Sequence, residues 1–210
     1  MLIRIGLTGK IASGKTEATK LLKELGAFVI DYDGISRGLI TRGSEFYSRA
    51  CELAVKRAFS SKKNDILDSS GSIDRRKLST LVFEDETDKK RKRLNKIFHA
   101  RVAKIALEIE RENAQYYPII IHSVPLLFEA RLDFLFDTIL LITTTNDIRL
   151  HRLIENRGIP SELAQKILDR QISDYEQADR SDFIIDSSNS LDEFRANVAD
   201  YWNRINAAVK

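Results

Sequence analysis

The chain has few of the residues that stabilise extracellular or membrane-embedded proteins. It has one cysteine in 210 residues, Cys51, so no disulfide can form within the chain and a reducing compartment is indicated. No stretch approaches the ~20 consecutive apolar residues of a membrane-spanning helix. The residues after Met1 also lack the apolar region and cleavage site of a secretory signal peptide. We therefore expect a cytoplasmic protein that does not interact with membranes.

An excess of one charge is missing too. The chain has 34 Lys and Arg residues against 31 Asp and Glu residues, a formal net charge of +3. This balance does not indicate a broad polyanion-binding surface, so nucleic acid is not an expected partner. His99 and His151 lack cysteine, histidine or acidic partners at zinc-ligand spacing, so a zinc site is not expected. Hydrophobic residues at 43% and charged residues at 31% are typical of a globular protein.

The hydrophobic pattern predicts strands that alternate with helices. Residues 2–7 form a short β-rich run, a helical pattern follows that Gly26 ends, and residues 27–30 form a second strand. This strand–helix–strand order predicts a parallel sheet with a right-handed crossover. Further strands are expected at 119–121, 138–142 and 183–185, and helices at 46–59, 75–83, 89–113, 146–155, 161–175 and 191–205.

The order of these patterns predicts an α/β fold that is interrupted by helical segments. Residues 1–42, 117–148 and 180–210 are expected to form the α/β core with its parallel sheet. Residues 43–116 are expected to form an inserted helical domain, and residues 149–179 a separate helical segment.

The most specific motif lies at residues 9–16, which we call the phosphate loop. It matches G-x-x-x-x-G-K-[ST] and stands between a predicted strand and a predicted helix, as the chemistry requires. Backbone N–H groups of such a loop surround phosphate oxygens, and the helix adds the positive end of its dipole. We expect Lys15 to reach the β- and γ-phosphates and the Thr16 hydroxyl to bind Mg²⁺. The predicted ATP-binding residues are Gly9, Lys10, Ile11, Ala12, Ser13, Gly14, Lys15, Thr16 and Glu17.

Two aspartates follow the second predicted strand, in the order Asp31-Tyr32-Asp33. On extended backbone, residues two apart project to the same side, so both carboxylates would reach one place at the sheet's carboxyl edge. Phosphoryl transfer needs a metal partner there, which we assign to Asp31, and a base for the attacking hydroxyl, which we assign to Asp33. Asp33 also precedes a predicted helix, so a capping role is an alternative that is compatible with the first.

The third predicted strand lacks the terminal aspartate that often binds Mg²⁺ in phosphate-loop proteins. His122 and Ser123 stand there instead. Mg²⁺ would then depend on Thr16, Asp31, the nucleotide phosphates and water. His122 lies among apolar residues and is expected to pack in the core.

An ordered set of motifs along the chain is similar to that of the dephospho-CoA kinases. It begins with Gly6-Leu7-Thr8-Gly9 and the phosphate loop, and its most distinctive part is Val124-Pro125-Leu126-Leu127-Phe128-Glu129. The resemblance runs from Gly6 to about Asp186. The other matching segments are Asp31 to Arg37, Asp74 to Leu78 with Val82-Phe83, Leu94 to His99, Leu150 to Arg152, Gln171, and Ser181 to Asp186.

The resemblance implies transfer of the ATP γ-phosphate to the ribose 3′-hydroxyl of dephospho-CoA, the last step of coenzyme A synthesis, with Mg²⁺. It implies a P-loop core, with residues 43–116 as the acceptor-binding domain and 149–179 as a lid. Asp33 would be the base, and Lys15 and Arg152 would stabilise the transferring phosphate. Thr8, Asp33, Arg75 and His99 would lie near the acceptor. Without the resemblance, Arg152 would be taken as a surface arginine.

The chain departs from the family pattern at several positions. Lys10 and Ala12 replace glycines, and Tyr32 replaces a small residue. Asn156-Arg157-Gly158 stands where the family usually has Arg-Asp-Gly, so the arginine is shifted by one position. The alternatives are another P-loop small-molecule kinase, of the shikimate or nucleotide type, or a non-enzymatic NTP-binding switch. The two aspartates favour a kinase, because a switch has no need of a base for an acceptor hydroxyl.

Overall fold

The computed structural model describes residues 2–61, 65–85 and 87–208. It contains two compact units, one formed by residues 1–31 with 110–210 and the other by residues 32–109. We call them the sheet unit and the helical unit.

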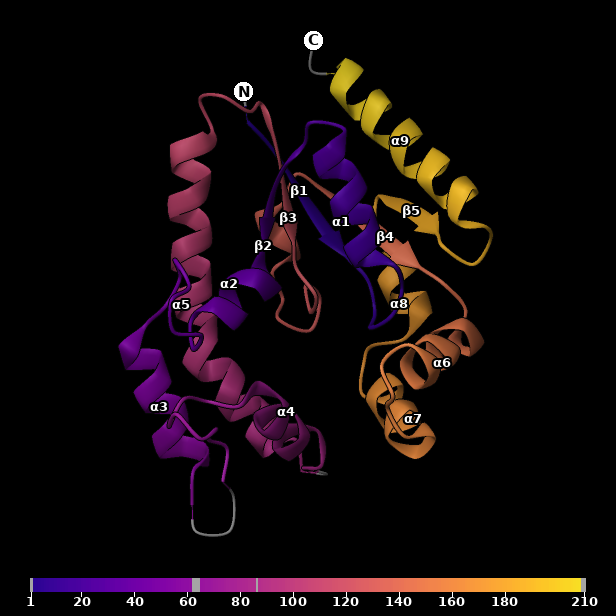
Figure 1. The fold of residues 1–210 in the computed structure, drawn as a ribbon. Helices are drawn as coiled ribbons and strands as arrows, with labels where there is room; N and C mark the ends of the chain where they lie inside the picture. The colour runs from indigo at the N-terminus through magenta and orange to yellow at the C-terminus, as the bar shows by residue number, and fades with distance from the viewer. Residues whose placement is uncertain (1, 62–64, 86, 209–210) are drawn as a thin grey trace. The chain divides into compact units, whose positions relative to one another are not determined.

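The sheet unit is built on five parallel strands in the order β2-β3-β1-β4-β5 (Figure 1). The central strands β3, β1 and β4 consist mostly of buried residues rich in isoleucine and leucine, as expected where both faces of a parallel sheet are covered. The predicted α/β class with a parallel sheet is thus confirmed. The strands are β1 (Ile3–Thr8), β2 (Phe28–Asp31), β3 (Ile119–Ser123), β4 (Thr138–Thr143) and β5 (Phe183–Asp186).

Helices α1 (Lys15–Glu24) and α9 (Leu191–Ala208) pack against each other in the sheet unit (Figure 1). Their apolar faces share one core with the sheet, in which Leu22, Val198 and Trp202 are buried. The Trp202 indole Nε1 donates a 3.0 Å hydrogen bond to the Leu25 carbonyl. The helix expected at 191–205 is thus present, and its first residue, Leu191, is 51% exposed and lies outside this core.

The segment between β4 and β5 forms three short helices, and the first two of them share a second small core. They are α6 (Asn146–Glu155), α7 (Ser161–Asp169) and α8 (Asp174–Asp179). The prediction of a single helix at 161–175 was wrong, because two helices, α7 and α8, occupy this region. The Ser173 side chain accepts from the Glu176 N–H at 3.0 Å and so caps a new helix. A short 3₁₀ helix, Asp133–Leu135, precedes β4.

The helical unit contains α2 (Tyr32–Gly38), α3 (Arg49–Phe59), α4 (Arg75–Phe83) and most of α5 (Lys89–Asn113). The predicted bounds of α4 and α5 are confirmed. The helix expected from residue 46 begins at Arg49 because Ser48 caps it. Helix α2 was expected to follow Asp33, but it begins at Tyr32 and so includes Asp33.

A buried carboxylate stabilises the start of α3. Glu52 is 3% exposed, and its Oε1 lies 2.9 Å from Arg42 Nη2 and 2.7 Å from Lys56 Nζ. The Tyr47 hydroxyl donates to the other oxygen. Hydrogen bonds from Lys56, Tyr47 and Arg42 outweigh the effect of burial and lower the pKa of Glu52 to about 2. This network ties the segment before α3 to the helix.

The helical unit comprises residues 32–109, whereas the helical domain was predicted at residues 43–116. The helical unit begins at residue 32 because α2 belongs to it, with Ile35 and Leu39 buried. It ends at residue 109 because Glu110 bonds to Arg4 and His122 of the sheet unit. The functional division into core, acceptor-binding domain and lid stays a prediction. Among the described residues, no helix is long and apolar enough to cross a membrane.

Candidate active site

The phosphate loop joins β1 to α1 and requires glycine at two positions. A Cβ added at Gly9 would lie 2.3 Å from the Ile142 carbonyl oxygen and 2.6 Å from Ser13 Oγ, so no side chain fits there. Gly14 caps α1 with a φ of 98°, in the left-handed region that glycine adopts without strain. The loop backbone therefore passes close to β4 and turns directly into α1.

Side chains on the outer side of the loop hold its carbonyl groups. Ser187 Oγ donates to the Ser13 carbonyl at 2.7 Å, and Arg152 Nη1 donates to the Ala12 carbonyl at 3.0 Å. Because the C=O and N–H of one peptide plane point in opposite directions, the Gly14 N–H is turned to the inner side. The loop thus directs a backbone donor inward at the positive end of α1, which is the arrangement that binds phosphate.

Two buried hydroxyls at this loop suit a polar ligand. The Thr8 and Ser13 hydroxyl oxygens are buried and have no hydrogen-bond partner among the described residues. Thr8 is the last residue of β1 and is fully buried, and its predicted place near the acceptor stays a prediction. A buried polar atom without a partner is costly, so a bound ligand would offset that cost.

Lys15 extends from the first residue of α1 to the end of β3. Its Nζ donates a 3.0 Å hydrogen bond to Ser123 Oγ, and Ser123 is 1% exposed. Ser123 stands at the end of β3, where phosphate-loop proteins often have an aspartate, and it was not among the predicted site residues. The available signal was its place at the end of β3, because β3 and β1 pair in parallel and end together. Thr16, the predicted Mg²⁺ ligand, follows Lys15 with an exposed side chain.

Asp31 and Asp33 do not share one extended segment, so the prediction that both project to the same side of such a segment was wrong. Asp31 is the last residue of β2, but α2 begins at Tyr32, so Asp33 lies in the first turn of a helix and is exposed. The capping alternative required Asp33 to precede a helix, and it is wrong because Asp33 lies inside α2. A carboxylate in the first turn is favoured by the helix dipole.

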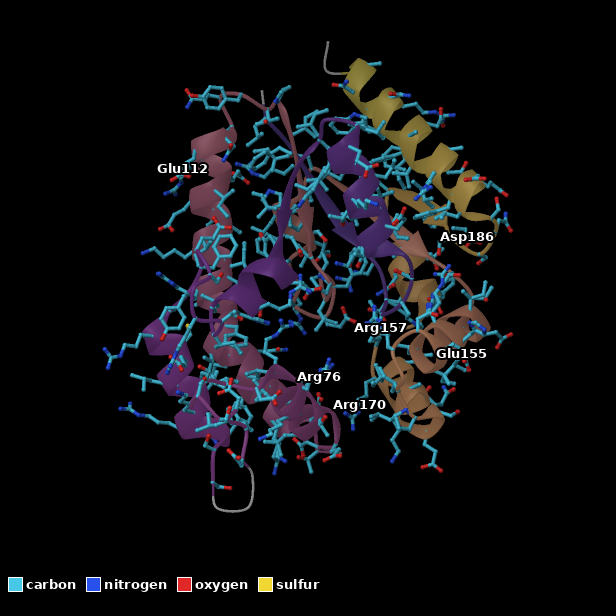
Figure 2. All side chains as sticks on the ribbon, viewed as in Figure 1. Arg76, Glu112, Glu155, Arg157, Arg170 and Asp186 are labelled. Atoms are coloured by element: carbon cyan, nitrogen blue, oxygen red, sulfur yellow. The ribbon has the colours of Figure 1, made fainter. Side chains whose placement is uncertain are left out.

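Arg152 of α6 lies against the loop backbone. Besides the Ala12 carbonyl, it donates to the Ser187 hydroxyl at 3.1 Å and the Ser187 carbonyl at 3.0 Å. Burial lowers the pKa of Arg152. Arg157, which follows Asn156 after α6, has an exposed side chain (Figure 2). The contacts of Arg152 show it supporting the loop, and its action on the transferring phosphate stays a prediction.

Three further side chains from distant segments contact the loop or α1, namely those of Gln171, Asp174 and Arg195. Gln171 Oε1 accepts from the Ile11 N–H at 3.0 Å. Lys10 is 7% exposed, and its Nζ lies 3.2 Å from Asp174 Oδ2. Glu17 accepts from Arg195 Nη2 at 2.8 Å. Gln171 already belonged to a recognised motif, whereas no sequence signal indicated Asp174 or Arg195.

The remaining predicted acceptor residues lie in the helical unit. Arg75 is the first residue of α4, directly after the Asp74 cap, and is exposed. His99 lies on α5 and is exposed as well. Both are thus on the surface of the helical unit, where a ligand can reach them.

His122 is packed in the sheet unit, as predicted. It is 2% exposed, and its Nε2 lies 3.1 Å from Glu110 Oε2. Burial lowers the pKa of His122 although Glu110 acts in the opposite direction. Arg4 holds the same carboxylate through Nε at 3.1 Å and Nη2 at 2.9 Å. This trio attaches the end of α5 to the sheet.

Comparisons with known proteins decide which kind of phosphate-binding protein this is. A family model described as dephospho-CoA kinase matches residues 3–193. The chain belongs to the dephospho-CoA kinase family. The dephospho-CoA kinase of Fusobacterium nucleatum is 36% identical over 189 residues, which is 90% of this chain and 91% of that protein. The predicted family is thus confirmed.

Solved structures agree with this family and with the fold. A dephospho-CoA kinase from Campylobacter jejuni matches with a TM-score of 0.67 and 26% identity, over 100% of both chains. A shikimate kinase from Acinetobacter baumannii matches with a TM-score of 0.50 and 15% identity, over 99% of this chain and 95% of that one. The second likeness shows a shared kinase fold alone.

Proposed function

We propose that this protein transfers the γ-phosphate of ATP to the ribose 3′-hydroxyl of dephospho-CoA. The observation that carries the proposal is a complete phosphate loop, with the Gly14 N–H turned inward at the start of α1, in a chain that the family model matches over residues 3–193. The reaction would complete coenzyme A synthesis. The single cysteine fits the reducing cytoplasm as the place of that reaction.

The phosphate loop and Lys15 would hold the nucleotide. The Gly14 N–H and its neighbours at the start of α1 would donate to the β- and γ-phosphate oxygens, and the Lys15 ammonium would add a full charge. Ser123 would position the Lys15 ammonium through their 3.0 Å hydrogen bond. Glycine at positions 9 and 14 allows the backbone to approach the phosphates.

Oxygen ligands suited to Mg²⁺ are available at two positions. The Thr16 hydroxyl and the Asp31 carboxylate are hard oxygen donors, which Mg²⁺ prefers, and nucleotide phosphates and water would complete the shell. The metal, when bound, neutralises negative charge on the phosphate oxygens.

Asp33 would act on the acceptor. Its exposed carboxylate can accept a hydrogen bond from the 3′-hydroxyl and take its proton as the new P–O bond forms. Thr8, Arg75 and His99 would contact dephospho-CoA, with the cationic Arg75 suited to its phosphate groups. Arg152 would reach the transferring phosphate from its place against the loop, and residues 149–179 would cover the bound phosphates as a lid that excludes water.

The test is ADP release with Mg-ATP and four parallel acceptor conditions: dephospho-CoA, AMP, shikimate and none. We expect turnover with dephospho-CoA alone. Turnover with AMP or shikimate instead would keep the kinase and refute its substrate. ADP release without any acceptor would favour an ATPase, and no release under any condition would favour an NTP-binding switch.

A further inference from the structure

The side chain of Lys10 leaves the phosphate loop and enters the protein. It is 7% exposed, and its Nζ forms a 3.2 Å ion pair with Asp174 Oδ2 at the start of α8. A cation buried to this degree requires a charged partner, because desolvation of an unpaired ammonium is costly. Asp174 therefore determines where the Lys10 side chain lies, and with it the start of the loop.

Asp174 is itself held by Arg149 of α6. Arg149 Nη2 donates to Asp174 Oδ1 at 2.6 Å and Nη1 donates to Asp174 Oδ2 at 3.0 Å, so the guanidinium binds both carboxylate oxygens in a bidentate manner. Arg149 is fully buried, and its Nη1 also donates to Asn146 Oδ1 at 2.7 Å. Its Nη2 lies 3.4 Å from Thr143 Oγ1 at the end of β4. The carboxylate that meets Lys10 is thus fixed to the sheet.

The charges in this chain of contacts are complementary at neutral pH. Burial alone would raise the pKa of Asp174, but the hydrogen bonds and charges of Arg149 and Lys10 outweigh burial and hold this pKa below its ordinary value. One carboxylate therefore lies between two cations. If Asp174 were neutral, Lys10 and Arg149 would face each other without a compensating charge.

The same segment also holds the next residue of the loop. Gln171, three residues before Asp174, accepts from the Ile11 N–H at 3.0 Å. Two consecutive loop residues, Lys10 and Ile11, are thus fixed by side chains from the turn after α7 and from the first residue of α8. Ile11 packs against the small core that contains Leu153 and Leu168. The first half of the loop therefore takes its shape from this turn.

We propose that Lys10, Asp174 and Arg149 form a positioning network that holds the phosphate loop in its nucleotide-binding shape. This inference rests on the proposed kinase function, and it assigns Lys10 a role apart from direct contact with phosphate. A pre-shaped loop binds nucleotide more tightly, since less ordering accompanies binding. The network does not act on the acceptor. Its loss therefore raises the Kd and KM for ATP and leaves kcat and the KM for dephospho-CoA unchanged.

The alternative is that Lys10 binds phosphate directly and that Asp174 restrains it. The two ideas predict opposite effects of Asp174→Asn. In the positioning network, this substitution removes the anchor and weakens nucleotide binding. If Asp174 merely restrained a phosphate ligand, the released Lys10 would tighten nucleotide binding.

The experiment measures binding of Mg²⁺ with a non-hydrolysable ATP analogue by calorimetry, followed by steady-state kinetics with dephospho-CoA. Binding of the analogue requires no acceptor, so failure of the proposed substrate would not be mistaken for failure of the network. The variants are Lys10→Met, Lys10→Arg, Asp174→Asn and the double variant of Lys10→Met with Asp174→Asn. The control is Lys20→Met on α1, where Lys20 is 65% exposed and pairs loosely with Glu24 at 3.8 Å.

We expect Lys10→Met and Asp174→Asn each to raise the Kd roughly tenfold, and the double variant to add little, as for residues that act as one unit. Lys10→Arg should restore binding, and Lys20→Met should match the unchanged protein. Lys10→Met leaves the Asp174–Arg149 pair intact, so it carries the test if Asp174→Asn does not fold. An unchanged Kd in Lys10→Met, tighter binding in Asp174→Asn, or a loss confined to kcat would each overturn the proposal.

Discussion

Replacement of Glu52 by glutamine tests the electrostatic network of the helical unit. The substitution keeps the shape of the side chain and removes its charge. Glu52 is 3% exposed, and its carboxylate forms ion pairs with Arg42 Nη2 at 2.9 Å and with Lys56 Nζ at 2.7 Å. It also accepts a hydrogen bond from the Tyr47 hydroxyl. Glutamine can accept hydrogen bonds but cannot pair with two cations, so we expect the helical unit to be destabilised.

The size of the effect follows from the pKa of Glu52. That pKa is about 2 in the folded protein against an ordinary value of 4.5. Each pKa unit corresponds to about 1.36 kcal/mol, so the shift sets an upper limit of about 3 kcal/mol on the stabilisation. Arg42 is half exposed, and water screens its interaction. We therefore expect a loss of about 1–2 kcal/mol in the free energy of unfolding at neutral pH.

The pH dependence has a definite sign. Because folding lowers the pKa of Glu52, its stabilisation is fully present above the unfolded pKa, near 4.5, and is lost as the pH falls towards about 2. Glutamine does not titrate. The stability difference between the unchanged protein and Glu52→Gln should therefore be largest at neutral pH and shrink below pH 4.5.

Urea unfolding followed by far-UV circular dichroism measures this difference. Trp202, the single tryptophan, lies in the sheet unit, so its fluorescence follows that unit during the same titration. The matched control is Glu108→Gln on α5, where Glu108 is 50% exposed and lies 3.8 Å from Lys104. If Glu52→Gln is no less stable than the control at neutral pH, or if the difference persists in acid, the reasoning is refuted.

Three further substitutions test the phosphate loop and the proposed base. Asp33→Asn should lower kcat by about 10²–10⁴ with little change in the KM for ATP, and unchanged turnover would remove Asp33 from the role of base. Lys15→Ala should lower kcat and raise the KM for ATP, each roughly tenfold or more, and normal values of both would contradict the loop assignment. Ala12 has a φ of 61°, a left-handed conformation that costs a non-glycine residue about 1–2 kcal/mol, so Ala12→Gly should raise the thermal midpoint. A lower midpoint would show that the packing of Ala12 outweighs its strain.

The sheet and most helices could be predicted because their signals are local. Buried parallel strands are runs of isoleucine and leucine, and helices such as α5 (Lys89–Asn113) show apolar residues at helical spacing. The phosphate loop could be predicted because its glycines are required by close backbone contacts, as at Gly9. The pattern lies in one short segment, although the contact that requires Gly9 comes from Ile142 of β4.

The errors and omissions concern changes of local structure and contacts between distant segments. Asp33 was placed on extended backbone because nothing indicated that α2 begins at Tyr32. The break between α7 and α8 depends on the cap at Ser173, a residue type that is also common inside loops. The pair of Lys10 with Asp174 and that of Lys15 with Ser123 join distant segments. One sequence does not reveal such pairs, because they depend on how strands and turns meet in the fold.

The product of the reaction provides the most direct test of the proposed function. The protein would be incubated with Mg-ATP and dephospho-CoA, and the product examined by mass spectrometry and phosphorus NMR. The account predicts one ADP for each acceptor consumed and one new phosphomonoester, located on the ribose 3′-hydroxyl. A phosphate on another hydroxyl, or ADP formed while dephospho-CoA remains unchanged, would contradict it.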